Sequence, residues 1–95
     1  MISCHTRRII QFVGAFAIVT LQWDPNPPDQ YIASYRIYRA TSSTGAYTLL
    51  KTVKTPSVST RVEIPSLETR CYKLKAVNIL GQVSPFSAEI CRTAE

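Results

Sequence analysis

Apolar and polar residues alternate along most of this chain. Residues 19–23 and 71–76 show the clearest alternation, with every second side chain apolar. A period of two is typical of a β-strand that buries one face. Clusters of Pro, Gly, Asn, Asp and Ser separate these segments and mark turns. The pattern predicts strands at residues 19–23, 33–40, 47–53, 60–64, 71–78 and 84–91.

The alternation also predicts which side chains point inward. Leu67 lies outside the strands, and we expect it to fill the corner before the last two strands. The other inward positions belong to the strands themselves. The predicted core consists of Val19, Leu21, Trp23, Tyr35, Ile37, Val62, Ile64, Leu67, Tyr72, Leu74, Ala76 and Ile90.

The last two predicted strands form a hairpin with a cysteine at each base. If Ile90 points inward with Leu74, then Cys91 points outward, to the side of the sheet that carries Cys71. The turn around Gly81 lies midway between the two cysteines. The sequence therefore predicts a cross-strand disulfide that closes a loop of about 20 residues and stabilises the domain by roughly 3 kcal/mol. Such a bond indicates an oxidising compartment, and so a secreted or cell-surface protein.

Length and composition narrow the fold class. The 95 residues are enough for one domain with one hydrophobic core. With 45% hydrophobic and 18% charged residues, the chain is globular rather than disordered. No helical periodicity is long enough to supply the crossovers of a parallel sheet. We therefore expect an all-β, antiparallel sandwich.

Three motifs follow one another between residues 18 and 93. They are VTLQWDPNP at 19–27, SYRIYR at 34–39, and YKLKAVN at 72–78, which is followed by Gly81 and by SPFS at 84–87. In this order and spacing they resemble a fibronectin type III domain. The resemblance implies a seven-stranded, immunoglobulin-like β-sandwich at residues 18–95. Cysteines in the sixth and seventh strands resemble a variant found in secreted bacterial modules of this type.

One feature of that resemblance is missing. Arg70 stands at the position that usually holds the corner tyrosine of these domains. The Cys71–Cys91 disulfide is expected to replace the anchor that the tyrosine would provide.

Residues 1–17 allow two interpretations. Residues 8–13 form a first strand that turns at Gly14 to pair with the next strand, or the segment is a secretory signal peptide cleaved after Ala17. Arg7 and Arg8 before an apolar run favour the leader, whereas cleavage would expose residues 19–23 as an edge. If the apolar run extends through Leu21, the segment also fits a signal anchor, and this interpretation alone predicts membrane contact.

The net charge of +5 is spread along the chain, which argues against a nucleic-acid partner. The outward residues Arg36, Tyr38, Lys73 and Lys75 are expected to share one face of the sheet. A basic face with one aromatic side chain suits an acidic glycan or an acidic protein surface. An ordinary solvated sheet face is the simpler interpretation.

Candidate catalytic chemistry is sparse. His5 is the only histidine, and the three cysteines lack a CxxC spacing, so the sequence offers no nucleophile with its base and no metal centre. Asp24, Asn26 and Asp29 lie close together, but turn formation explains them better than calcium. We therefore predict no catalytic residue, metal or cofactor, and no enzymatic activity.

Two classes of function remain. In the first, the chain is a binding or spacer module, in which Ile79, Leu80 and Val83 form an unusually apolar loop that contacts a protein. The same class includes a carbohydrate-binding accessory domain of a secreted enzyme. In the second, a structural subunit self-associates through residues 1–17, with Cys4 linking chains. Light scattering with and without reductant distinguishes the two classes.

Overall fold

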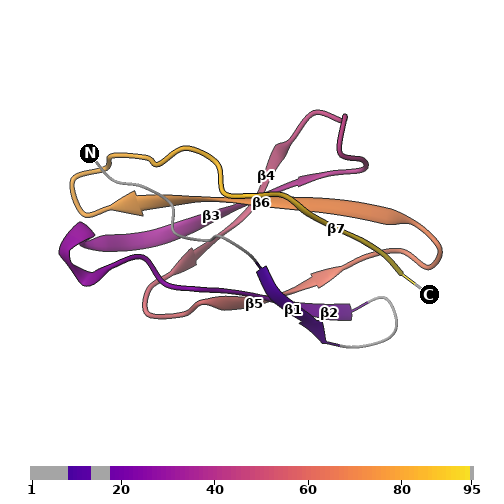
Figure 1. The fold of residues 1–95 in the computed structure, drawn as a ribbon, viewed down its shortest axis with the longest axis horizontal. Coiled ribbons are helices and arrows are strands. Elements are labelled where there is room, and N and C mark those ends of the chain that lie inside the picture. Colours follow the sequence, from indigo (N-terminus) through magenta and orange to yellow (C-terminus); the bar gives the residue numbers. More distant parts are fainter. Residues whose placement is uncertain (1–8, 14–17, 95) are drawn as a thin grey trace.

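The computed structural model describes residues 9–13 and 18–94, which form two antiparallel sheets packed face to face (Figure 1). The smaller sheet has the strand order β1-β2-β5, and the larger sheet has the order β4-β3-β6-β7. A short 3-10 turn, η1, links β2 to β3. The described elements are β1 (Ile9–Val13), β2 (Ile18–Trp23), η1 (Pro28–Gln30), β3 (Ile32–Ala40), β4 (Thr48–Lys54), β5 (Ser59–Glu63), β6 (Thr69–Asn78) and β7 (Ile90–Thr93).

The architecture confirms the predicted antiparallel β-sandwich. Consecutive β3 and β4 form a hairpin, whereas β6 returns to lie on the other side of β3. The described part of the chain contains no helix with the length and apolar character that a membrane crossing requires.

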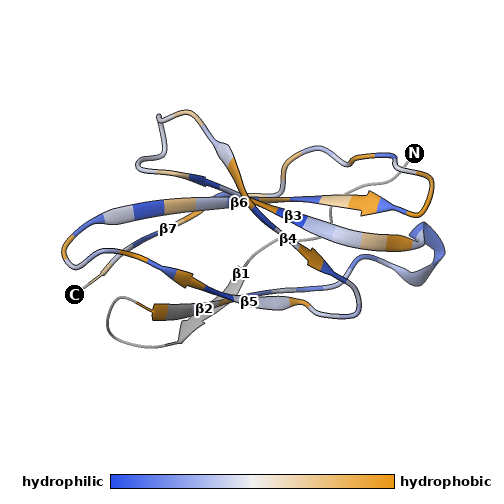
Figure 2. Cartoon of the chain, turned by 180° about the vertical axis from the view of Figure 1, so that it is seen from behind, coloured by the Kyte–Doolittle hydropathy of each residue, from blue (hydrophilic) through white to orange (hydrophobic). Residues whose placement is uncertain are grey.

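The core lies between the two sheets. Trp23 of β2 packs edge-on against Tyr35 of β3, with their ring centroids 5.5 Å apart. Figure 2 shows hydrophobic and hydrophilic residues alternating along β6, as expected for a strand with one buried face. Ile90 is partly buried against this core, and the side chain of Val19 lies outside the description. The remaining predicted core residues, apart from Leu67, are all buried: Leu21, Trp23, Tyr35, Ile37, Val62, Ile64, Tyr72, Leu74 and Ala76.

The expectation for Leu67 is wrong. Its side chain is 81% exposed, and its backbone adopts a left-handed conformation with φ of 65°. The Leu67 N–H donates to the carbonyl of Ala94, and the Ala94 N–H donates to the carbonyl of Glu68. This turn directs Leu67 toward solvent, and Ala94 is the residue from this corner that joins the core.

The returning arm of the last hairpin is shorter than predicted, because regular pairing with β6 covers only Ile90–Thr93. Between residues 84 and 89 the strand is interrupted, and Pro85 has no N–H for a ladder. Two serines replace part of the ladder. The Oγ of Ser84 accepts the Ala76 N–H at 2.7 Å, and the Oγ of Ser87 accepts the Leu74 N–H at 2.8 Å.

The N-terminal strand is present as β1, which pairs antiparallel with β2. Residues 9–13 therefore form a strand, as the first of the two interpretations of this segment predicts. Cys4, His5 and the predicted turn at Gly14 lie outside the described residues. Cleavage after Ala17 stays a prediction for intact-mass measurement of secreted material.

Candidate functional site

The larger sheet brings together the four outward residues that the sequence singled out. In the register of β3 and β6, Arg36 lies opposite Lys75 and Tyr38 lies opposite Lys73. Both strands are interior in the order β4-β3-β6-β7. The four side chains therefore lie near the middle of a sheet face.

Two aromatic residues that sequence reasoning missed complete this surface. The Nζ of Lys73 lies 4.4 Å from the ring centroid of Tyr47, and the Nζ of Lys75 lies 4.3 Å from that of Phe86. Lys73 also approaches Phe86, at 5.2 Å, and Lys75 approaches Tyr38, at 5.6 Å. We call this surface the lysine–aromatic face; it comprises Arg36, Tyr38, Tyr47, Lys73, Lys75 and Phe86.

Phe86 is the centre of the lysine–aromatic face. Its ring meets the ring of Tyr38 edge-on at 5.1 Å and an interplanar angle of 87°, and it lies 6.2 Å from the ring of Tyr47. Phe86 reaches this position because Ser84 and Ser87 fasten the irregular segment on either side of it to β6. The aromatic rings thus come from β3, from the residue before β4, and from the segment before β7.

Glu89 anchors one edge of this surface. The Tyr47 hydroxyl donates a hydrogen bond to the Glu89 carboxylate. Burial raises the pKa of Tyr47 above its ordinary value, and the hydrogen bond and negative charge of Glu89 raise the pKa further. The phenol is therefore protonated at neutral pH and holds the Tyr47 ring beside Lys73.

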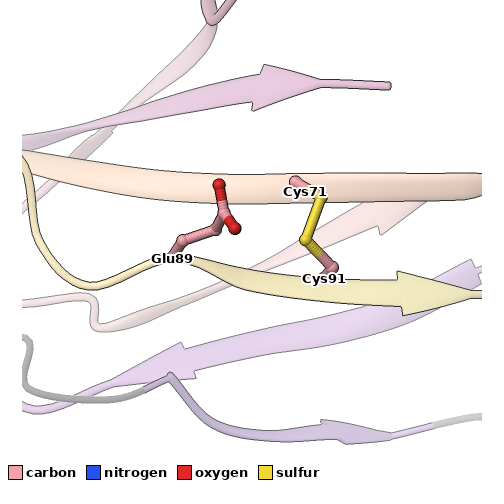
Figure 3. Close-up of side chains that lie close together, drawn as sticks. All are labelled: Cys71, Glu89 and Cys91. Carbon is pink, nitrogen blue, oxygen red and sulfur yellow. A yellow bond between two sulfur atoms is a disulfide. The ribbon is translucent and has the colours of Figure 1, made fainter. Parts of the chain in front are cut away.

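The predicted disulfide is confirmed. Cys71 and Cys91 are directly paired in the register of β6 and β7, and their sulfurs are 2.02 Å apart. Figure 3 shows the carboxylate of Glu89 beside this bond. The three side chains are close enough to resemble a ligand set, but sulfurs joined in a disulfide offer no thiolate to a metal.

The loop before β3 has the structural role that its composition suggests. Asn26 is buried, and its N–H donates to the Tyr35 hydroxyl at 2.8 Å. The Nδ2 of Asn26 also donates to Gln30 Oε1 at 2.8 Å. These bonds hold the turn together, in line with turn formation as the role of Asn26.

Ile79, Leu80 and Val83 form a second exposed surface. Their side chains are 68%, 79% and 41% exposed. The Ile79 N–H donates to the carbonyl of Tyr31, and the side chain of Tyr31 is exposed as well. We call these four residues the apolar tip. The side chain of Asn78 shapes the loop, because its Oδ1 accepts the N–H groups of Leu80 and Gln82.

Two open hollows lie elsewhere on the described chain. One, of about 490 Å³, lies between β4 and β5, and the other, of about 410 Å³, lies beside the proline-rich loop before β3. Neither lining includes a residue of the lysine–aromatic face. Their linings are Ile18, Arg39, Leu50, Lys51, Arg61, Val62 and Glu63 for the first, and Pro25, Asn26, Pro27, Pro28, Tyr31, Ile32, Tyr35, Thr55, Pro56 and Val58 for the second.

Comparison with known proteins identifies the fold. No family model matches the chain, and no curated protein matches it. Among solved structures, an Fn3-like protein from Clostridium thermocellum is 25% identical, with a TM-score of 0.69 over 93% of this chain and 96% of that protein. The chain thus has a fibronectin type III-like fold, as the sequence motifs imply.

Parts of larger enzymes share this fold. A β-1,2-glucanase from Parabacteroides distasonis matches with a TM-score of 0.75 and 19% identity over 88% of this chain. The pectate lyase PelI from Erwinia chrysanthemi, solved with tetragalacturonic acid, matches with a TM-score of 0.71 and 13% identity over 85% of this chain. The chain spans 12% of the glucanase and 26% of the lyase. At these identities the likeness concerns the fold alone.

Proposed function

We propose that this chain is a non-catalytic binding module of a secreted or cell-surface protein, and that the lysine–aromatic face binds an acidic partner. The fibronectin type III-like fold supports the role of a rigid scaffold. The Cys71–Cys91 disulfide supports an oxidising compartment. Similar folds within a glucanase and a pectate lyase support the role of an accessory domain beside a carbohydrate-active partner.

The observation that carries this proposal is the concentration of positive charge at the lysine–aromatic face. Arg36, Lys73 and Lys75 lie on neighbouring strands, and among the described residues neither lysine forms an ion pair. Glu89 is the one acidic side chain that the described residues show bonded to this face, and its carboxylate is engaged by Tyr47. The surface therefore attracts anions.

A panel of soluble polymers tests the proposal. Affinity electrophoresis measures retardation of the domain by two anionic polymers, polygalacturonate and polyglutamate, and by neutral dextran. Lys73→Gln/Lys75→Gln removes two charges from the face. Lys51→Gln/Arg61→Gln is the control, because it removes two charges that line the hollow between β4 and β5, outside this face. We expect retardation by at least one anionic polymer, and we expect only the first variant to lose it. Equal losses in both variants, or no retardation at all, would refute the proposal.

One observation supports self-association as a second candidate function. β1 is an edge strand of the smaller sheet, and an edge strand can pair with the same strand of a second copy. Light scattering of the full chain measures this directly. A monomer both with and without reductant would eliminate self-association through residues 1–17 and Cys4.

A further inference from the structure

We infer that the lysine–aromatic face binds a linear polyuronate, and that its aromatic rings position the lysine ammonium groups instead of stacking on sugar rings. This inference rests on the proposed function and names its ligand class.

The rings are already engaged by cations. Lys73 lies over Tyr47, and Lys75 lies over Phe86 and more distantly over Tyr38. Tyr38 and Phe86 also contact each other edge to face. A sugar that stacked on these rings would have to displace the ammonium groups. An anionic sugar meets cations whose side chains are already ordered, so less conformational entropy is lost on binding.

The spacing of the cations suits a chain of repeated anions. Lys73 and Lys75 are two residues apart on one strand, which separates their Cα atoms by about 7 Å. Arg36 lies opposite Lys75 at a cross-strand distance of about 5 Å. A small monovalent anion can contact one of these three cationic groups, whereas a polymer that carries a carboxylate on every unit can contact several of them at once.

The location of the face favours a polysaccharide over an acidic peptide. Peptides that bind to sheets in extended form obtain much of their affinity from main-chain hydrogen bonds at a sheet edge. Here β3 is paired with both β4 and β6, and the N–H groups of Leu74 and Ala76 are bonded to Ser87 and Ser84. In the middle of this sheet only side chains are available to a ligand. A polyuronate can bind these side chains through its carboxylates.

Substitutions at Phe86 test how the rings act. Phe86→Leu keeps an apolar side chain and removes the ring beneath Lys75 and near Lys73. Without this ring a lysine side chain must be ordered on binding, which predicts an affinity for polygalacturonate that is weaker by about two- to tenfold. Phe86→Tyr retains the ring and should keep the wild-type affinity. Leu80→Ala at the apolar tip is the matched control and should also bind normally.

Titration calorimetry with polygalacturonate, polyglutamate and dextran completes the test, with near-ultraviolet circular dichroism as the check that each variant is folded. We expect binding to polygalacturonate above polyglutamate, no binding to dextran, and at least about tenfold weaker binding in Lys73→Gln/Lys75→Gln. Stronger binding to polyglutamate would overturn the polyuronate assignment but keep the proposed function. Dextran binding that Phe86→Leu abolishes would show that the rings stack on sugars. Binding to neither anionic polymer would refute the inference and the proposed function together.

Discussion

Removal of the Cys71–Cys91 disulfide should lower the stability of the domain more than most single changes outside the core. The bond joins β6 to β7, and β7 is a strand of four residues that pairs, among the described strands, with β6 alone. Besides the backbone ladder, a hydrogen bond between the hydroxyls of Thr69 and Thr93 also holds the two strands together. Reduction therefore loosens the element that follows Phe86 and Glu89.

The size of the effect follows from the loop that the bond closes. The cysteines are 20 residues apart, and the chain-entropy model gives a loop of this length about 3 kcal/mol of stabilisation. A domain of 95 residues has a total unfolding free energy of about 5 to 14 kcal/mol. The domain should thus remain folded without the bond, with a melting temperature lower by roughly 12 to 24 °C.

Urea unfolding of Cys71→Ala/Cys91→Ala, made in a Cys4→Ala background, measures this loss. Alanine avoids placing a hydroxyl at position 71, which is buried. The single Cys4→Ala variant is the control and should unfold at the same urea concentration with the disulfide intact. A loss of less than about 1 kcal/mol in the triple variant, relative to the Cys4→Ala control, would contradict the chain-entropy reasoning.

Three further predictions concern stability. Ser87→Ala removes the side-chain acceptor of the Leu74 N–H and should cost about 0.5 to 1.5 kcal/mol in urea unfolding, whereas the exposed Ser43→Ala should cost almost nothing. Leu67→Ala should change stability by less than about 0.5 kcal/mol, whereas Leu74→Ala should cost about 2 to 5 kcal/mol. Similar costs for the two variants would show that Leu67 is part of the core. The pKa of Tyr47 is raised, so its contribution to stability is complete below about pH 10 and is lost as the pH rises further. Over that alkaline range the melting temperature of Tyr47→Phe should fall less steeply with pH than that of the wild type. An equally steep fall in both proteins would rule out this contribution.

Local alternation explains which parts of the fold were predictable. Inward residues such as Leu21, Ile37 and Leu74 lie on regular strands, where the side-chain direction follows from counting by two. The disulfide was predictable for the same reason, because Cys71 and Cys91 both lie within the paired parts of β6 and β7. The pairing of Arg36 with Lys75 likewise needed only two regular strands in register.

The residues that sequence reasoning missed lie where that counting fails. A regular strand with Ile90 inward would also place Phe86 inward, but the irregular segment at 84–89 turns Phe86 to the outer face. Pro85 was the available signal for this break. Tyr47 precedes β4, and Leu67 has a positive φ. The directions of these side chains depend on turn geometry and long-range contacts, which periodicity does not encode.

The most direct test of the central claim is a nuclear magnetic resonance titration of the ¹⁵N-labelled domain with short polygalacturonate fragments. The account predicts that the largest chemical-shift changes fall on Arg36, Lys73, Lys75 and the segment at 84–89. The apolar tip should be unaffected. Chemical-shift changes confined to Tyr31, Ile79 and Leu80 would contradict the account. The absence of any change at polymer concentrations that fully retard the domain in affinity electrophoresis would also contradict it.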